Sequence, residues 1–338
     1  MTMKTALILA GAVAKGAFGA GVLAELSKHA AALPIANVVG ASAGALNACV
    51  FATGVRSGRA LEVSERLASL WETEATWHNV LRVSATDLLG GRGVGDGKRL
   101  VPIMRGAMAP LPSGGDALSP MTLGLVVTAL NGRLDELSPG EYATTFEQTV
   151  QFTDADFDTD AGRDRLVQTA LGSAAFPLVF APVDVPDIGP CIDGGAVNNT
   201  PIRRVLDADD GIERILVVTT EPLVIKPEPG ARGIALIGQI ADILINERLF
   251  RDLHEAKSVN RYLEELDALR AKGVPEETLL EVKKILGWEH REIVQIRPAS
   301  PLDGSSFKGF SHPELMQAYV AAGREAAKGV LGELGISS

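Results

Sequence analysis

Ser42 is the residue whose surroundings point most directly to covalent chemistry. It is the centre of the pentapeptide Gly40-Ala-Ser-Ala-Gly44, between an apolar run that suits a buried strand, 35–39, and an alanine-rich stretch that suits the start of a helix, 45–51. Glycines on both sides let a strand turn sharply into a helix, which exposes the serine Oγ to a substrate. The helix N-terminus also offers backbone N–H groups to an anion. The alternative is an ordinary serine in a tight turn.

A serine hydroxyl is a weak nucleophile that needs a general base, and Asp193 is the candidate. It follows an apolar residue and precedes the glycine pair Gly194 and Gly195, where another part of the backbone can approach closely. Partial burial raises the pKa of a carboxylate and makes it a better base. The alternative is an aspartate in a simple Asp-Gly turn.

A loop near the N-terminus offers donors for an oxyanion. Its residues follow a strand expected over 5–10 and open a helix expected over 16–30: Gly11, Ala12, Val13, Ala14, Lys15 and Gly16. Backbone N–H groups in such a loop can point at an anion. A plain strand-to-helix connection is the alternative. A nucleotide site fits poorly, because no Gly-Lys-Ser/Thr sequence is present here and the pair Gly19 and Gly21 lies inside the expected helix.

These three elements, in this order and spacing, resemble the patatin-like phospholipase family. That family has a glycine-rich oxyanion loop after its first strand, a Gly-x-Ser-x-Gly elbow on the next strand, and a later Asp-Gly-Gly or Asp-Gly-Ala motif. The resemblance covers about residues 4–220. The matching segments are 7–16 with 21–23, 40–44, 174–183, 193–195, and Asn198, Asn199 and Pro201.

The resemblance implies an α/β fold of three layers, with a mainly parallel central sheet flanked by helices. It implies a serine–aspartate dyad without histidine, in which Ser42 attacks a lipid ester and Asp193 accepts its proton. An acyl-enzyme on Ser42 would then be hydrolysed by water. The implied substrates are phospholipids, galactolipids, neutral lipids and short esters, and no cofactor is needed.

The oxyanion loop departs from the family pattern at two positions. Ala12 and Val13 stand where the family has glycines. Valine resists a positive φ, whereas glycine accepts it freely. We therefore expect either a shifted loop or fewer N–H donors.

The composition of the chain limits the classes of partner that it could bind. The chain has 338 residues, a formal net charge of −10 and 46% apolar residues, which is typical of a globular protein. The negative charge argues against nucleic acid as a partner and predicts that any transient membrane contact is apolar. Two cysteines form no disulfide framework, so we expect a cytoplasmic protein. A peripheral location on a membrane is the alternative. None of the five histidines has the spacing of a metal site.

Two segments resemble membrane-directed sequences, one a signal peptide and the other a transmembrane helix. Residues 1–14 resemble a short signal peptide, but a first buried strand entering a loop is the preferred interpretation. Residues 30–55 contain no Asp, Glu, Lys or Arg, but proline, asparagine, glycine and serine interrupt the run. We expect a strand, a turn and a buried helix there, and no transmembrane helix.

We expect one domain over residues 1–338, with a motif-bearing catalytic core over 4–220. Residues 232–338 are expected to be a mostly helical elaboration with a returning strand at 292–297. A strand is expected over 121–130, with Asn131 and Gly132 as its turn.

Two further segments are open to a functional or a structural interpretation. The helical segment around Leu236 and Ile243 is expected to pack on the sheet, with lipid contact as the alternative. The irregular segment 55–120, with its glycine-rich stretch 90–97, is either a lid over the Ser42 cleft or a surface loop.

Two other functions remain open. An α/β-hydrolase with a Ser-Asp-His triad would recruit a histidine such as His312. A non-catalytic lipid-binding protein on the same fold would explain Ala12 and Val13.

Overall fold

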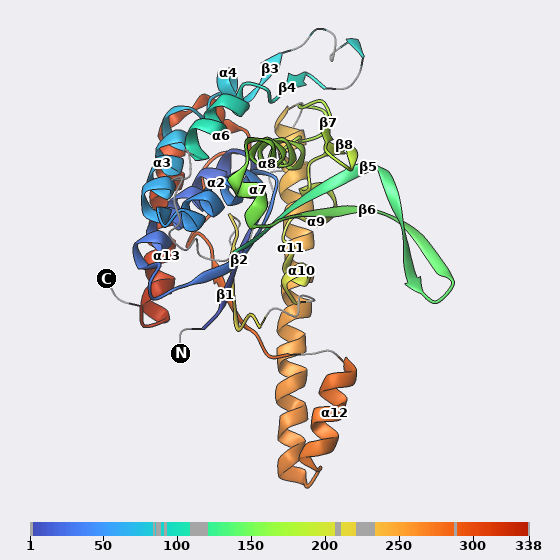
Figure 1. Cartoon of the computed structure of the whole chain (residues 1–338). Coiled ribbons are helices and arrows are strands. Elements are labelled where there is room, and N and C mark those ends of the chain that lie inside the picture. Colours follow the sequence, from blue (N-terminus) through green and yellow to red (C-terminus); the bar gives the residue numbers. More distant parts are fainter. Residues whose placement is uncertain are drawn as a thin grey trace.

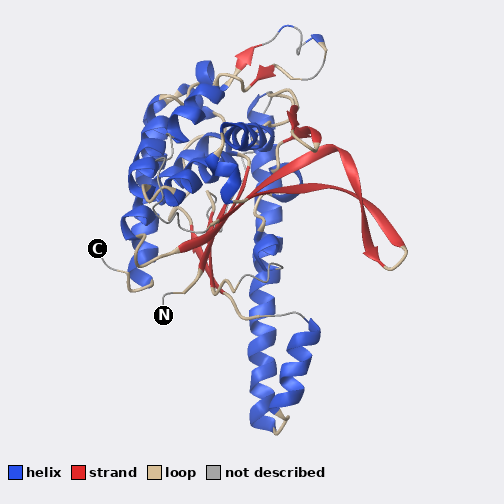
Figure 2. Cartoon of the chain, in the orientation of Figure 1, coloured by secondary structure: helices blue, strands red, loops and turns tan. Residues whose placement is uncertain are grey.

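A mixed β-sheet organises the molecule, with helices on both of its faces (Figures 1 and 2). The computed structural model describes residues 3–83, 85, 89–90, 93–108, 121–206, 211–220, 234–286 and 289–336. Among these residues the main sheet has the order β10-β9-β1-β2-β5-β8-β7, and β6 pairs with β5. Its strands are β1 (Thr5–Leu9), β2 (Ile35–Ala41), β5 (Thr122–Ser138), β6 (Glu141–Phe152), β7 (Val183–Val185), β8 (Gly189–Ile192), β9 (Arg214–Val218) and β10 (Glu292–Ile296).

The strands β10, β9, β1, β2 and β5 run parallel, and β6, β7 and β8 add antiparallel pairs at one side. Neighbouring residues of β1 face opposite layers: Leu7 belongs to the larger hydrophobic core, whereas Ile8 belongs to the smaller one. Both are fully buried because a parallel strand covered on both faces needs apolar side chains at every position.

Helices cover the two faces unequally. The larger core lies under α1 (Gly16–Leu26), α2 (Ala43–Arg56), α3 (Ala60–Thr73), α8 (Asp160–Ser173) and α13 (Pro313–Glu333). The smaller core lies under α10 (Ile202–Leu206) and α11 (Ile234–Ala268). The expected α/β fold of three layers, with a mainly parallel sheet, is thereby confirmed.

Shorter elements connect these layers. They are η1 (Val13–Lys15), η2 (Ser27–His29), α4 (Trp77–Val80), β3 (Arg82–Val83), β4 (Gly95–Asp96), α6 (Leu100–Met108), α7 (Asp154–Asp158), α9 (Gly195–Asn198), η3 (Leu269–Lys272), α12 (Glu276–Leu286) and η4 (Lys308–Ser311). Figure 1 shows two parts that extend from the body: a helical hairpin of α11 and α12, and the far end of the β5–β6 hairpin.

The two segments that resemble a signal peptide and a transmembrane helix are part of the folded core. Residues 5–9 are the central strand β1, and residues 35–56 are β2 followed by α2. In the part of the chain that the structure describes, no helix is both long enough and apolar enough to cross a membrane.

The expected turn at Asn131 and Gly132 is wrong. β5 continues to Ser138, and the register between β5 and β6 shifts between Thr128 and Arg133. The local Asn-Gly signal therefore marks a bulge, with Gly132 at φ 65°. The chain reverses instead near Gly140, which has φ 82°.

Among the described residues of α11, those that pack on the sheet lie further along the chain than the expected contacts at Leu236 and Ile243. Leu236 and Ile243 are exposed, whereas Leu253 and Ala256 lie in the smaller core. The described part of segment 55–120 contains α3, α4 and α6. Residues 84, 86–88, 91–92 and 109–120 lie outside the described residues, so the lid stays a hypothesis, as does the division of the chain into one domain.

Gly21, one of the two glycines that were weighed as part of a nucleotide site, serves helix packing. A Cβ at Gly21 of α1 would lie 2.1 Å from the carbonyl oxygen of Val320 in α13. A Cβ at Gly323 of α13 would lie 2.0 Å from the carbonyl oxygen of Phe18 in α1. The two helices therefore touch backbone to backbone, and only glycine fits at the crossing.

Gly323→Ala should destabilise the protein by roughly 1–3 kcal/mol, because the added methyl forces α1 and α13 apart. Gly329→Ala, on the same helix with nothing within 4 Å of the new methyl, should stabilise it by roughly 0.5–1 kcal/mol. Urea unfolding of both variants measures the difference. Equal effects of the two substitutions would contradict the close crossing.

Candidate active site

Ser42 is held in a strained turn between β2 and α2. Its backbone has φ 54° and ψ −129°, a conformation that residues with side chains rarely adopt. A Cβ at Gly40 would lie 2.6 Å from the carbonyl oxygen of Gly44, and a Cβ at Gly44 would lie 2.1 Å from that of Leu9. Both glycines are therefore required by close backbone contacts, as the elbow interpretation of the sequence expects.

The structure brings Ser42 and Asp193 together although 151 residues separate them. Ser42 Oγ donates a hydrogen bond of 2.6 Å to Asp193 Oδ2. The Gly195 N–H donates to the other carboxylate oxygen, Oδ1, at 2.7 Å. Asp193 lies between β8 and α9 and is 4% exposed, and Ser42 is 6% exposed. Water therefore reaches neither side chain freely.

Burial raises the pKa of Asp193 to about 7, and the hydrogen bonds from Ser42 and Gly195 act in the opposite direction. Taking a carboxylate out of water disfavours its charged form, and here two donors recover only part of that loss. The result is a carboxylate whose proton affinity matches neutral pH, as a general base requires.

The end of α8 aligns both residues. Ser173 Oγ accepts a hydrogen bond from the Ser42 N–H at 2.9 Å and donates to the carbonyl of Val126 in β5. The carbonyl of Ser173 accepts the Gly194 N–H, and that of Ala175 accepts the Asp193 N–H. One short segment thus ties the elbow and the aspartate loop to the same strand.

The loop of residues 11–16 has a glycine-like backbone although Ala12 and Val13 stand where the family has glycines. Val13 has φ 53°, which a β-branched residue adopts only under strain. The backbone at Val13 is therefore strained, whereas the expected shift of the loop stays a hypothesis. The Lys15 N–H donates to the carbonyl of Ala12 and closes the turn, and buried Gly16 packs against Ala43 of the elbow helix.

Gly11 lies directly over the elbow. A Cβ at Gly11 would be 2.5 Å from the Cβ of Ser42. The carbonyl of Gly11 accepts a hydrogen bond of 3.1 Å from Asn199 Nδ2, so it is turned toward Asn199. Among the described residues, the N–H groups of Gly11, Ala12 and Val13 have no hydrogen-bond acceptor. These amides are therefore free of an internal acceptor among the described residues.

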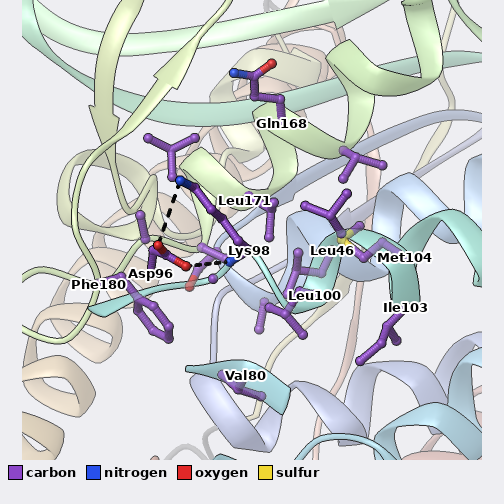
Figure 3. A pocket seen from close by; sticks show the side chains of 18 of the residues that line it. Leu46, Val80, Asp96, Lys98, Leu100, Ile103, Met104, Gln168, Leu171 and Phe180 are labelled. Atoms are coloured by element: carbon purple, nitrogen blue, oxygen red, sulfur yellow. Dashed lines mark hydrogen bonds and ion pairs between the residues drawn. The ribbon is translucent and has the colours of Figure 1, made fainter. Parts of the chain in front are cut away.

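An apolar cavity of about 580 Å³ leads to the pair (Figure 3). Its walls come mainly from α2, α3, α6 and α8 and from the loop before β7. Apolar side chains dominate them: Leu46, Val50, Leu67, Leu70, Trp71, Val80, Leu100, Val101, Ile103, Met104, Val167, Leu171, Phe176, Phe180 and Phe310. Polar side chains such as Asp96, Lys98 and Gln168 also line it. A cavity of this size and character suits a hydrocarbon chain.

None of the five histidines lines this cavity among the described residues. His312 contacts Glu314 instead, and both oxygens of Asp193 are already bonded to Ser42 and Gly195. The Ser-Asp-His alternative therefore lacks its third member.

The sequence model of the patatin-like phospholipases matches residues 7–206, more than half of the chain. The chain therefore belongs to the patatin-like phospholipase family. Membership supports hydrolysis of lipid esters.

Three solved structures are similar to this chain at low identity. VipD from Legionella pneumophila shares 13% identity, with 98% of this chain and 67% of VipD covered and a TM-score of 0.42. The type III effector protein ExoU shares 16%, with 100% and 54% covered and a TM-score of 0.42. The heterodimeric ExoU–SpcU complex of the Pseudomonas aeruginosa type III secretion system shares 18%, with 75% and 52% covered and a TM-score of 0.28. This chain spans about half the length of ExoU. No curated protein matches it.

Sequence reasoning missed Ser173 and the contact that Asn199 makes. Ser173 directly precedes the stretch 174–183 that carries the family resemblance, but nothing local shows that its hydroxyl reaches the Ser42 amide. Thr128 was also missed, although its hydroxyl donates to the carbonyl of Asp193 at 2.7 Å. The roles of Ser173 and Thr128 arise only where β2, β5, α8 and β8 meet, and that of Asn199 only where the end of α9 meets the loop after β1.

The raised pKa of Asp193 makes stability depend on pH. The unfolded chain releases this proton near pKa 3.8 and the folded protein near 7, so the folded state binds more protons between these values. The contribution of Asp193 to the free energy of unfolding is thus fully present below about pH 4 and is lost as pH rises to about 7. Relative to Asp193→Asn, the wild type should lose a few kcal/mol of unfolding free energy across this window. Urea unfolding of both proteins tests this, and a constant difference would rule out the raised pKa.

Proposed function

We propose that the protein is a serine lipid acyl hydrolase that cleaves carboxylic esters with Ser42 and Asp193. The observation that carries the proposal is the buried hydrogen bond of 2.6 Å between Ser42 Oγ and Asp193 Oδ2 at an apolar cavity. A nucleophile that already donates to its base, with room beside it for a hydrocarbon chain, is arranged for acyl transfer.

In the first half of the reaction, Ser42 Oγ forms a bond to the ester carbonyl carbon as its proton passes to Asp193 Oδ2. The ester C–O bond then breaks, and Asp193 returns the proton to the leaving alcohol oxygen. In the second half, a water oxygen attacks the acyl carbon while Asp193 takes a water proton. The Ser42–acyl bond breaks, the proton returns to Ser42 Oγ, and a free acid leaves.

The negative charge that develops on the carbonyl oxygen needs preorganised donors. The N–H groups of Gly11, Ala12 and Val13 supply them, with Lys15 and Gly16 completing the loop. The positive φ at Val13 supports this role, because the backbone keeps its turn although glycine is absent. The same observation favours an enzyme over the non-catalytic lipid-binding alternative.

Ser42→Ala should lower ester hydrolysis by roughly a thousandfold or more, since the nucleophile is lost. Ser69→Ala, on the exposed face of α3, is the matched control and should retain full activity. A fluorophosphonate probe followed by peptide mapping identifies the labelled residue. Labelling at a serine other than Ser42 would refute the assignment.

The activity should rise with pH and reach half of its maximum near pH 7, because Asp193 acts as a base only when ionised. Asp193→Asn should abolish this profile together with most of the activity, whereas Asp187→Asn on the neighbouring turn should change neither. The measurement is kcat/KM for a soluble ester from pH 5 to pH 9. A profile that persists in Asp193→Asn would assign the base elsewhere.

A further inference from the structure

A small surface beside the cavity combines exposed apolar and cationic side chains. We call it the mouth patch and define it by Val83, Val94 and Leu178 together with Arg82, Lys98 and Arg99. β3 and β4 pair through Val83 and Gly95. The N–H groups of Val94 and Gly95 both donate to the carbonyl of Val179. The patch is therefore continuous from β3 to the loop that holds Leu178.

The mouth patch borders the opening of the cavity. Asp96, the last residue of β4, and Lys98, two residues later, line the cavity, and so does Phe180, two residues after Leu178 (Figure 3). Figure 1 places β3 and β4 beside α4 and α6, at one end of the molecule. A surface that docks here would adjoin the route to Ser42.

Leu178 is both strained and exposed. Its φ is 72°, and its side chain is 70% exposed, whereas the flanking Phe176 and Phe180 line the cavity. Scattered exposed leucines are common and need no explanation. A leucine held at positive φ is costly, however, and no burial within the protein offsets that cost.

The charge of the mouth patch opposes that of the whole chain. Arg82 donates two hydrogen bonds to the carboxylate of Asp96, and Lys98 Nζ lies 4.0 Å from the same group. Among the described residues, Arg99 contacts the backbone carbonyl and ring of His78, neither of which is an acid. Asp96 offsets one of the three cations that define the patch, so these described residues together are positive within a chain of net charge −10.

We propose that the mouth patch docks on a lipid surface that carries anionic headgroups. Leu178, Val83 and Val94 enter the acyl region, and Lys98 and Arg99 contact headgroup phosphates. The inference rests on the proposed lipid substrate, because docking at the cavity mouth lets an acyl chain reach Ser42 without crossing water. Local charge thus adds an electrostatic contribution that the net charge of the chain does not suggest.

The far end of the β5–β6 hairpin provides a contrast. It exposes Leu134, Tyr142 and Phe146, but Asp135 and Glu136 make this arm acidic. Leu134 is 67% exposed, nearly the same as Leu178, and it contributes nothing to the cavity wall. It is therefore the matched control for Leu178.

The first test measures binding to vesicles of phosphatidylcholine with phosphatidylglycerol by co-sedimentation. All proteins carry Ser42→Ala, so the lipid is not consumed. Adding Leu178→Asn should weaken binding roughly tenfold or more, whereas adding Leu134→Asn should leave it unchanged. Asparagine tolerates positive φ better than leucine, so the 178 variant should fold at least as well.

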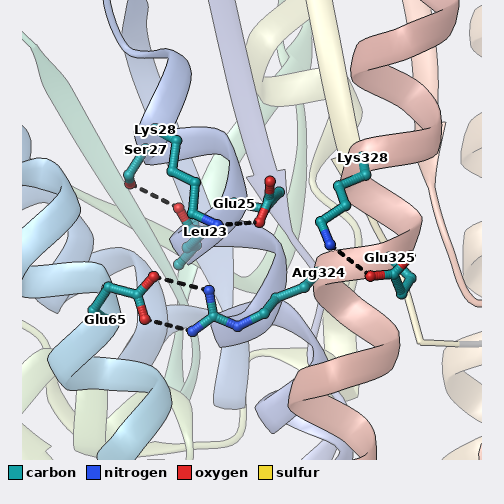
Figure 4. Close-up of polar contacts among 8 residues, drawn as sticks. All are labelled: Leu23, Glu25, Ser27, Lys28, Glu65, Arg324, Glu325 and Lys328. Carbon is teal, nitrogen blue, oxygen red and sulfur yellow. Dashed lines mark hydrogen bonds and ion pairs between the residues drawn. The ribbon is translucent and has the colours of Figure 1, made fainter. Parts of the chain in front are cut away.

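The second test addresses charge. Arg99→Glu should weaken binding to the anionic vesicles several-fold at low salt, and this loss should shrink at high salt. Lys328→Glu changes the net charge equally but lies on α13, where Lys328 pairs with Glu325 (Figure 4). It should bind like the parent protein.

Three outcomes would overturn the proposal: no vesicle binding by the Ser42→Ala protein, equal losses for Leu178→Asn and Leu134→Asn, or a dimer in solution that Leu178→Asn dissociates. The last would assign the patch to a second copy of the chain. Hydrolysis of a short soluble ester by Leu178→Asn with Ser42 intact should equal that of the wild type. Soluble ester hydrolysis tests the proposed function by itself, so the two ideas fail separately.

Discussion

The hydrogen bond between Ser42 and Asp193 is the interaction on which the remaining architecture depends. A carboxylate removed from water keeps a useful proton affinity only if its few donors are placed accurately. The two residues come from loops after β2 and β8, so no local structure can align them. The end of α8 does so instead, since Ser173 and Ala175 bind the backbone amides of Ser42, Gly194 and Asp193.

This alignment costs stability through backbone strain and through the burial of a charge. Two residues with side chains, Ser42 and Val13, hold positive φ values close to the reacting atoms. Asp193 carries its charge where burial opposes it. Strain and desolvation gather where the chemistry is proposed, while α1 and α13 make a close helix contact elsewhere. Stability from ordinary packing thus supports a site that is itself unfavourable.

The parts that sequence predicts well are those whose requirements are local. Gly40 and Gly44 identify the elbow because a sharp strand-to-helix turn leaves no space for a Cβ. The apolar runs of β1, β2 and β9 identify a buried parallel sheet. The failures have tertiary causes. Asn131 and Gly132 signal a turn, but continued pairing with β6 makes the site a bulge. Valine at position 13 argues against a positive φ, yet contacts of the surrounding loop hold its φ at 53°.

One of those contacts joins distant parts of the chain. The Ala14 N–H, in the oxyanion loop, donates to the carbonyl of Ser306, and Gly309 packs against the Ala14 side chain. Ribosomes deliver Ser42 and Asp193 well before they deliver this supporting segment. A nascent chain would therefore contain Ser42 and Asp193 while the loop of residues 11–16 still lacks its hydrogen bond to Ser306. The proposed site therefore gains this support only after Ser306 and Gly309 have been added to the chain.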